Sequence, residues 1–125
     1  EENVLCYEVD PYQNEDILIH EFAHAIHLMG LQHVYSNFNE LLTLAYSTAL
    51  AEGKWASTYA ATNIEEYWAE GVQNWFNCNA ESSPPDGVHN HINTRAELEA
   101  YDQGLYQLLE SYFTQSEKSI SCHTY

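Results

Sequence analysis

The sequence His20-Glu21-Phe22-Ala23-His24 combines side chains that bind metal ions with one that transfers protons. If this segment is helical, the two imidazoles lie one turn apart and about 40° around the axis, so both can reach one metal ion. Glu21 then lies about 100° from His20, where it can take a proton from a water molecule beside the metal. His-Glu-x-x-His in a helix is typical of zinc-dependent hydrolases.

The motif needs support from its surroundings, because a chain of this composition, with 7 histidines, would contain it by chance in roughly one case in twenty. The alternative to metal binding is that polar side chains are buried by accident in a helix that is otherwise almost wholly apolar from Ile17 to Met29. Such burial without hydrogen-bond partners is costly. We therefore expect His20 and His24 to bind a metal ion.

A catalytic zinc ion needs a third protein ligand and an open position. The metzincin pattern requires glycine at 27 and histidine at 30, but the sequence has His27 and Gly30. A glutamate from a later helix is the other source, and Glu66 fits it, while Glu70, one turn on, can accept a hydrogen bond from a ligand imidazole. Alone, these two glutamates would indicate a solvated acidic face. The upstream motif makes us favour the metal site.

The other histidines lie outside the motif, one on the same predicted helix and others in loops. His27 lies about 20° from His20 in helical projection and therefore faces the ligand side. We expect its side chain to hydrogen-bond to a metal ligand, or to form part of the polar wall of the cleft, rather than to bind the metal directly. His89 and His91 fall in a loop over 81–93 and are expected to be solvated.

Two helices must bring these residues together. The first is expected from Asp16 to Met29, with Gly30 as its terminator. The second is expected to begin at a capping box with Thr62 as N-cap and Glu65 as its partner, and to run to about residue 77. This register leaves Glu66 and Glu70 on one free face.

Three further segments have recognisable end signals. A helix is expected over 38–52, stopped by Gly53. Another is expected over 94–113, opened by the capping box Thr94 to Glu97. A β-prone run over 3–9 is the one good strand candidate.

The segment over 16–77 resembles the lethal-factor-like gluzincins, a group of zinc metallopeptidases that includes the anthrax lethal factor catalytic domain and the Mlc titration factor peptidases. Beyond the histidine motif, the resemblance is carried by the run YAATN at 59–63 and the run EYWAE at 66–70. A weaker similarity to the titration factor type extends over 98–113. The resemblance therefore rests mainly on residues 16–77.

The resemblance implies a role for each matching residue. His20, His24 and Glu66 would be the zinc ligands, and Glu21 the general base and acid. Tyr59 would be a phenol that donates a hydrogen bond to the oxyanion of the tetrahedral intermediate. Without the resemblance, Tyr59 would be one of 10 tyrosines and most simply a structural residue.

The fold class expected is mainly α: a helical zinc-metallopeptidase active-site subdomain with at most a short N-terminal strand. A chain of 125 residues with 45% hydrophobic content is long enough for one zincin-like domain over 1–125. The similar families place a mixed sheet before the active-site helix, whereas 15 residues precede Asp16 here. Our hypothesis is that the chain is a fragment or processed part of a larger protein.

Composition restricts the partners. A formal charge of −16 repels nucleic acid, and no apolar run is long enough to span a membrane. Cys6, Cys78 and Cys122 form no Cys-x-x-Cys pair, which argues against a zinc knuckle or a redox motif. An odd cysteine predicts a free thiol or a disulfide to a second polypeptide. An acidic, aromatic-rich chain of this kind favours a secreted protein.

These observations predict a zinc-dependent metalloendopeptidase that hydrolyses peptide bonds in a protein or peptide substrate, with Zn²⁺ as its cofactor. The alternative is a non-enzymatic protein, such as a toxin subunit or a binding or storage module, that retains a peptidase-derived zinc site. A structural zinc would have no use for Glu21 and would usually have four protein ligands. The enzyme is therefore the favoured hypothesis.

Overall fold

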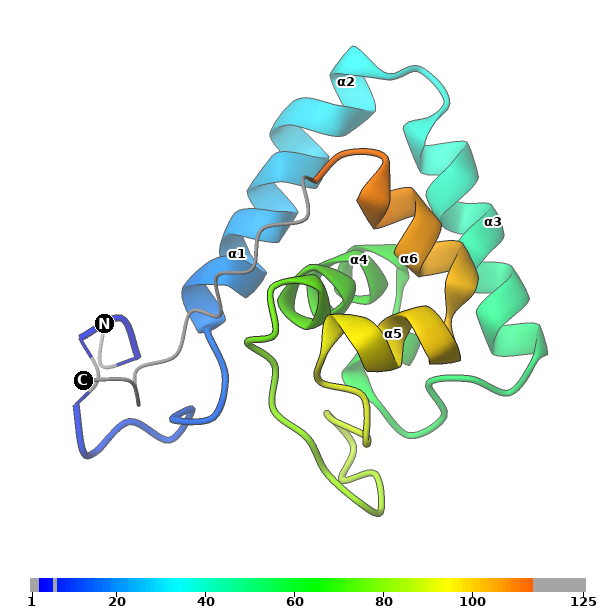
Figure 1. Ribbon diagram of the computed structural model, residues 1–125. Helices are drawn as coiled ribbons and strands as arrows, with labels where there is room; N and C mark the ends of the chain where they lie inside the picture. The colour runs from blue at the N-terminus through cyan, green and yellow to red at the C-terminus, as the bar shows by residue number, and fades with distance from the viewer. Residues whose placement is uncertain (1–2, 6, 114–125) are drawn as a thin grey trace.

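The helix that carries the histidine motif is longer than the sequence predicts. In the computed structural model, which describes residues 3–5 and 7–113, the motif lies on α1, Ile17–Ala25 (Figure 1). Helical geometry continues through a π-helical segment, η1, Ile26–Leu31, and a short α2, Gln32–Val34. The prediction that Gly30 ends the helix is wrong, because the backbone becomes extended only at Tyr35.

The segment before α1 is organised by turns. The side chain of Asn3 donates to the Asp10 carboxylate and to the carbonyls of Tyr12 and Glu15, and it accepts from the Ile17 backbone N–H, at 2.8 to 2.9 Å. The described residues of 3–9 contain no strand, so that prediction is wrong for them. A β-prone run needs a neighbouring strand for its backbone, and the described part of the chain supplies none.

The next helix, α3, Phe38–Ala51, agrees with its prediction. Its end is fixed by Gly53, whose φ of 75° lies in the left-handed region that favours glycine. The N–H of Gly53 donates to the Leu50 carbonyl, and the N–H of Lys54 donates to the Ala49 carbonyl, both at 3.0 Å. These two bonds satisfy carbonyls that the helix end would otherwise leave unpaired.

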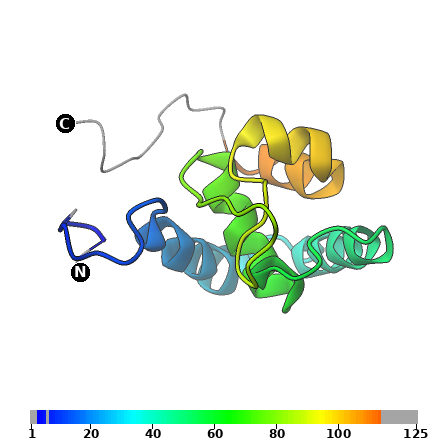
Figure 2. The ribbon, with the colours of Figure 1, turned by 90° about the horizontal axis from the view of Figure 1, so that it is seen from below.

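The helix α4, Ile64–Trp75, runs through the middle of the molecule, with α1 on one side and the last two helices on the other (Figure 2). Every residue from Tyr67 to Trp75 is buried. Its N-cap is Asn63, which accepts from the Glu66 N–H at 2.8 Å, so the predicted capping box beginning at Thr62 is wrong by one residue. Thr62 instead closes the preceding 3₁₀ turn, η2, Tyr59–Ala61.

The single helix predicted over 94–113 is two helices, α5, Arg95–Tyr101, and α6, Gln103–Glu110. The capping box at Thr94, with Glu97 as its partner, is confirmed. The break lies at Asp102, whose buried carboxylate accepts from Trp55 Nε1 at 2.8 Å and from the Tyr67 hydroxyl at 2.7 Å. The same carboxylate caps α6 by accepting from the Leu105 N–H.

The mainly α fold class is confirmed, and one buried hydrophobic cluster joins α4 to all its neighbouring helices. The outer face of α1 and η1 does not join that core. Leu18, Phe22 and Met29 on this face are 53%, 59% and 80% exposed. Within the described residues, no helix has the length and apolar character that crossing a membrane requires.

Candidate metal centre

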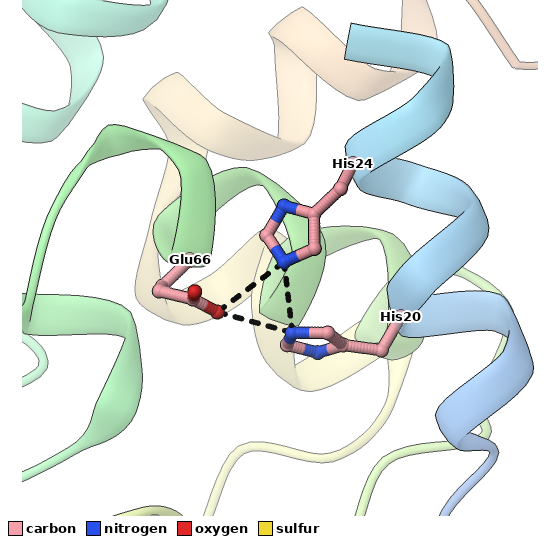
Figure 3. Close-up of side chains that lie close together, drawn as sticks. All are labelled: His20, His24 and Glu66. Carbon is pink, nitrogen blue, oxygen red and sulfur yellow. Dashed lines mark hydrogen bonds and ion pairs between the residues drawn. The ribbon is translucent and has the colours of Figure 1, made fainter. Parts of the chain in front are cut away.

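Three predicted ligands converge on one point between α1 and α4 (Figure 3). His20 Nε2 lies 3.0 Å from Glu66 Oε2 and 3.2 Å from His24 Nε2. The third side of this triangle, from His24 Nε2 to Glu66 Oε2, measures 3.5 Å. Side chains 42 and more positions apart in sequence are therefore brought within hydrogen-bonding distance by the crossing of two helices.

The geometry of this cluster fits a zinc ion. Ligand atoms about 2.0 to 2.1 Å from a tetrahedral zinc lie about 3.3 Å from one another. The three observed separations, 3.0, 3.2 and 3.5 Å, lie around that value. His20, His24 and Glu66 are only 10%, 19% and 15% exposed, and the side that remains accessible faces a cleft. Two nitrogens and one carboxylate oxygen with one open side are the ligand set that catalytic zinc sites use.

The cleft beside the ligands has a volume of about 610 Å³. Glu21 and Tyr59 both line it, as do Tyr12 and Val88. Glu21 is exposed, whereas the ring of Tyr59 stacks near the His20 ring, with 6.3 Å between centroids and 26° between planes. Both residues predicted to take part in chemistry thus share one cavity with the ligands.

The Nδ1 atom of His20 has two oxygen neighbours on α4. Gln73 Oε1 lies 2.8 Å away, and Glu70 Oε1 lies 3.5 Å away. Glu70 also accepts from the Asn79 amide at 2.9 Å. Glu70 therefore lies near His20, but Gln73 makes the shorter contact, and the sequence analysis did not identify it. Its spacing of seven from Glu66, two helical turns, was the available signal.

Burial raises the pKa of the Glu70 carboxyl, which is 4% exposed. The hydrogen bond from Asn79 and the nearby imidazoles of His20 and His89 act in the opposite direction. Neighbouring Glu15 adds to the upward shift. Glu70 is thus an acidic group enclosed among hydrogen-bond partners, rather than part of a solvated face.

His27 lies in the buried core and not at the cleft, which corrects the prediction from helical projection. Its ring is 1% exposed, and its Nε2 lies 2.9 Å from Asn39 Oδ1. It packs edge-on against Phe38 and Trp68. The projection was misleading because seven residues also advance the helix by about 10 Å along its axis, which carries His27 past the cleft into the core.

His89 is not the solvated loop residue that we expected. Its side chain is 12% exposed, and Nε2 lies 3.3 Å from Glu15 Oε2. This hydrogen bond raises the pKa of His89, although burial of the ring acts against it. The pair anchors the loop that supplies Val88 to the cleft wall. This contact could not be predicted, because nothing in the sequence around a loop histidine indicates a partner 74 positions away.

Cys78 is a free and buried thiol. Burial raises its pKa to about 12, with the carboxylates of Asp16 and Glu15 contributing. A thiol of this kind is unreactive at neutral pH. Cys6 and Cys122, the other candidates for a disulfide to a second polypeptide, lie outside the described residues.

Comparisons of this chain with protein families, with curated proteins and with solved structures found no match. The interpretation of the site therefore depends on its own geometry. The resemblance to the lethal-factor-like gluzincins, carried by the runs at 59–63 and 66–70, stays a prediction.

Proposed function

We propose that this protein is a zinc-dependent metalloendopeptidase of the gluzincin type. One observation carries the proposal: His20, His24 and Glu66 converge at tetrahedral spacing on the wall of an open cleft that also contains Glu21. The sequence resemblance to lethal-factor-like gluzincins supports the same ligand set. The acidic composition agrees with a secreted protein.

A bound zinc ion would supply a Lewis acid that polarises a substrate carbonyl and acidifies water. The residues around it would transfer the proton and stabilise the oxyanion. Glu21, exposed to the same cleft, is the base that accepts the proton of the attacking water and returns it to the leaving amine. Tyr59, on the adjacent 3₁₀ turn, is the hydroxyl donor for the oxyanion.

Recognition of the substrate must depend on side chains of the cleft. The described residues contain no strand to which an extended peptide could add. The cleft offers the aromatic rings of Tyr12 and Tyr59 and the apolar side chains of Ile17 and Val88. We therefore propose a protein or peptide substrate whose side chains enter this cavity.

The alternative function is a non-enzymatic toxin subunit, or a binding or storage module, that retains the zinc site. The lack of a strand among the described residues favours it, since the sheet edge that holds substrate in similar families is not seen there. The open side of the ligand set and the position of Glu21 favour the enzyme.

The deciding experiment is digestion of a peptide library by protein with a known zinc content. We expect cleavage that a chelator abolishes and added zinc restores. Glu21→Gln removes the base but leaves the ligands intact, so it should bind zinc normally and cleave at least about 100-fold more slowly. Full zinc occupancy without cleavage by the parent protein would support the binding module, and an active Glu21→Gln variant would refute the assigned base.

A further inference from the structure

Gln73 is a fully buried amide on the face of α4 that carries Glu66. Its Oε1 lies 2.8 Å from Nδ1 of the ligand His20. No feature of the zinc-ligand pattern requires a glutamine at this position. Its burial and its contact with a ligand imidazole together indicate a specific role.

The other end of the amide fixes which way the group points. Gln73 Nε2 donates to the backbone carbonyl of Asp16 at 3.1 Å and approaches the carboxylate of Glu15 at 3.4 Å. A carbonyl and a carboxylate can only accept, so the NH₂ group belongs on that side. The oxygen of the amide must then face His20.

An oxygen facing Nδ1 determines the tautomer of the imidazole. Gln73 Oε1 can only accept, so its contact with Nδ1 requires the proton on that nitrogen. Glu66 Oε2, 3.0 Å from Nε2, is also an acceptor, so a neutral ring satisfies both contacts when a metal ion takes the place of a proton between Nε2 and Glu66. His20 Nε2 then has a free lone pair directed at the point shared with His24 and Glu66. Asp16 also caps the N-terminus of α1, so the amide holds the ring relative to the helix on which it stands.

We propose that Gln73, and not Glu70, is the positioning residue that fixes the tautomer and orientation of His20 for zinc binding. The inference rests on the zinc site of the proposed function but not on hydrolysis. Glu70 Oε1 lies 3.5 Å from the same Nδ1, and the other oxygen of this carboxylate accepts from the Asn79 amide, so Glu70 is the more distant of the two acceptors. Outer residues that orient a metal-binding histidine typically change metal affinity by about 10- to 100-fold.

The first test reads the tautomer by ¹⁵N NMR of the histidine rings in metal-free Glu66→Ala, which removes the acceptor that competes with Gln73 for the proton of His20. We expect the Nδ1–H form of neutral His20 in this protein and a mixture of both forms when Gln73→Met is added, because methionine has similar length but no acceptor oxygen. An Nε2–H ring in Glu66→Ala would overturn the proposal. This measurement needs no change at Gln73, so it decides between the two tautomers even if Gln73→Met does not fold.

The second test is zinc affinity, measured by competition with a chelating dye. Gln73→Met should bind zinc about 10- to 100-fold more weakly than the parent, and Glu70→Met should lose less than Gln73→Met. Gln107→Met, an exposed glutamine on α6, is the matched control and should bind as the parent does. Parental affinity in Gln73→Met, or a larger loss in Glu70→Met, would contradict the inference alone. Zinc binding without peptide cleavage would contradict only the proposed function.

Discussion

At the scale of single residues, the proposed site assigns metal binding and proton transfer to different side chains. His20, His24 and Glu66 point their ligand atoms at one another, whereas Glu21 and Tyr59 lie around the open side of the same cleft. This arrangement allows each role to be removed without the other.

Tyr59 is the residue whose role is most open to a direct test. Tyr59→Phe removes the hydroxyl and leaves the ring that stacks near His20, so it should reduce kcat about 100-fold while the zinc affinity stays unchanged. Steady-state kinetics and a zinc titration measure the two effects separately.

The cleft provides a matched control for that variant. Tyr12 lines the same cavity on another segment, and Tyr12→Phe should leave kcat within about threefold of the parent. Equal losses in both variants would mean that the phenols act on the shape or polarity of the cleft rather than on the oxyanion.

At the scale of elements, the start of α4 positions Glu66. The Asn63 side chain accepts from the N–H of Glu66 itself, so the cap and the ligand belong to one helical turn. Asn63→Ala should lower the free energy of unfolding by about 1 kcal/mol, measured by urea denaturation.

The neighbouring threonine tests the register of that cap. Thr62 is exposed and has helical φ and ψ at the end of η2, so Thr62→Ala should change stability by less than about 0.5 kcal/mol. A larger cost for Thr62→Ala than for Asn63→Ala would restore the register that the sequence suggests.

These elements also show what could be predicted. The helices around the motif and around Glu66 were predictable because their apolar periodicity and end signals are local. The exact start of α4 was not, since Thr62 and Asn63 are both good N-caps and the choice depends on the 3₁₀ turn before them.

The break between α5 and α6 has only one local signal, Asp102 as an N-cap, and the contacts of its carboxylate with Trp55 and Tyr67 come from 47 and 35 positions away. Gln73 and His89 were missed for the same reason. Their importance comes from partners in other segments, and neither residue type specifies a role by itself.

At the scale of the whole molecule, the candidate ligands connect two helices that also meet through packing and through hydrogen bonds, such as that from Trp68 Nε1 to the Ala23 carbonyl. His20 and His24 come from α1 and Glu66 from α4, so a metal that binds the folded site stabilises their crossing. Free zinc at 100 times its Kd should add about 2.7 kcal/mol to the free energy of unfolding, and a chelator should remove it.

Thermal denaturation with and without zinc measures this coupling. Glu66→Ala should lose most of the zinc-dependent rise in Tm, because one of the three ligands is gone. Glu65→Ala, which removes the adjacent carboxylate outside the ligand cluster, should keep it. A zinc-dependent rise that survives in Glu66→Ala would mean that the metal binds elsewhere.

The buried carboxylate of Asp102 affects how the molecule unfolds. It accepts hydrogen bonds from Trp55 and from Tyr67 of α4, and it also begins α6 through the Leu105 N–H. Opening any one of these segments leaves buried polar groups of the others without a partner, which costs about 1 to 3 kcal/mol for each group. α4, which carries Glu66, and α6 should therefore open together as one cooperative unit, so that loosening of α6 disturbs the candidate metal site.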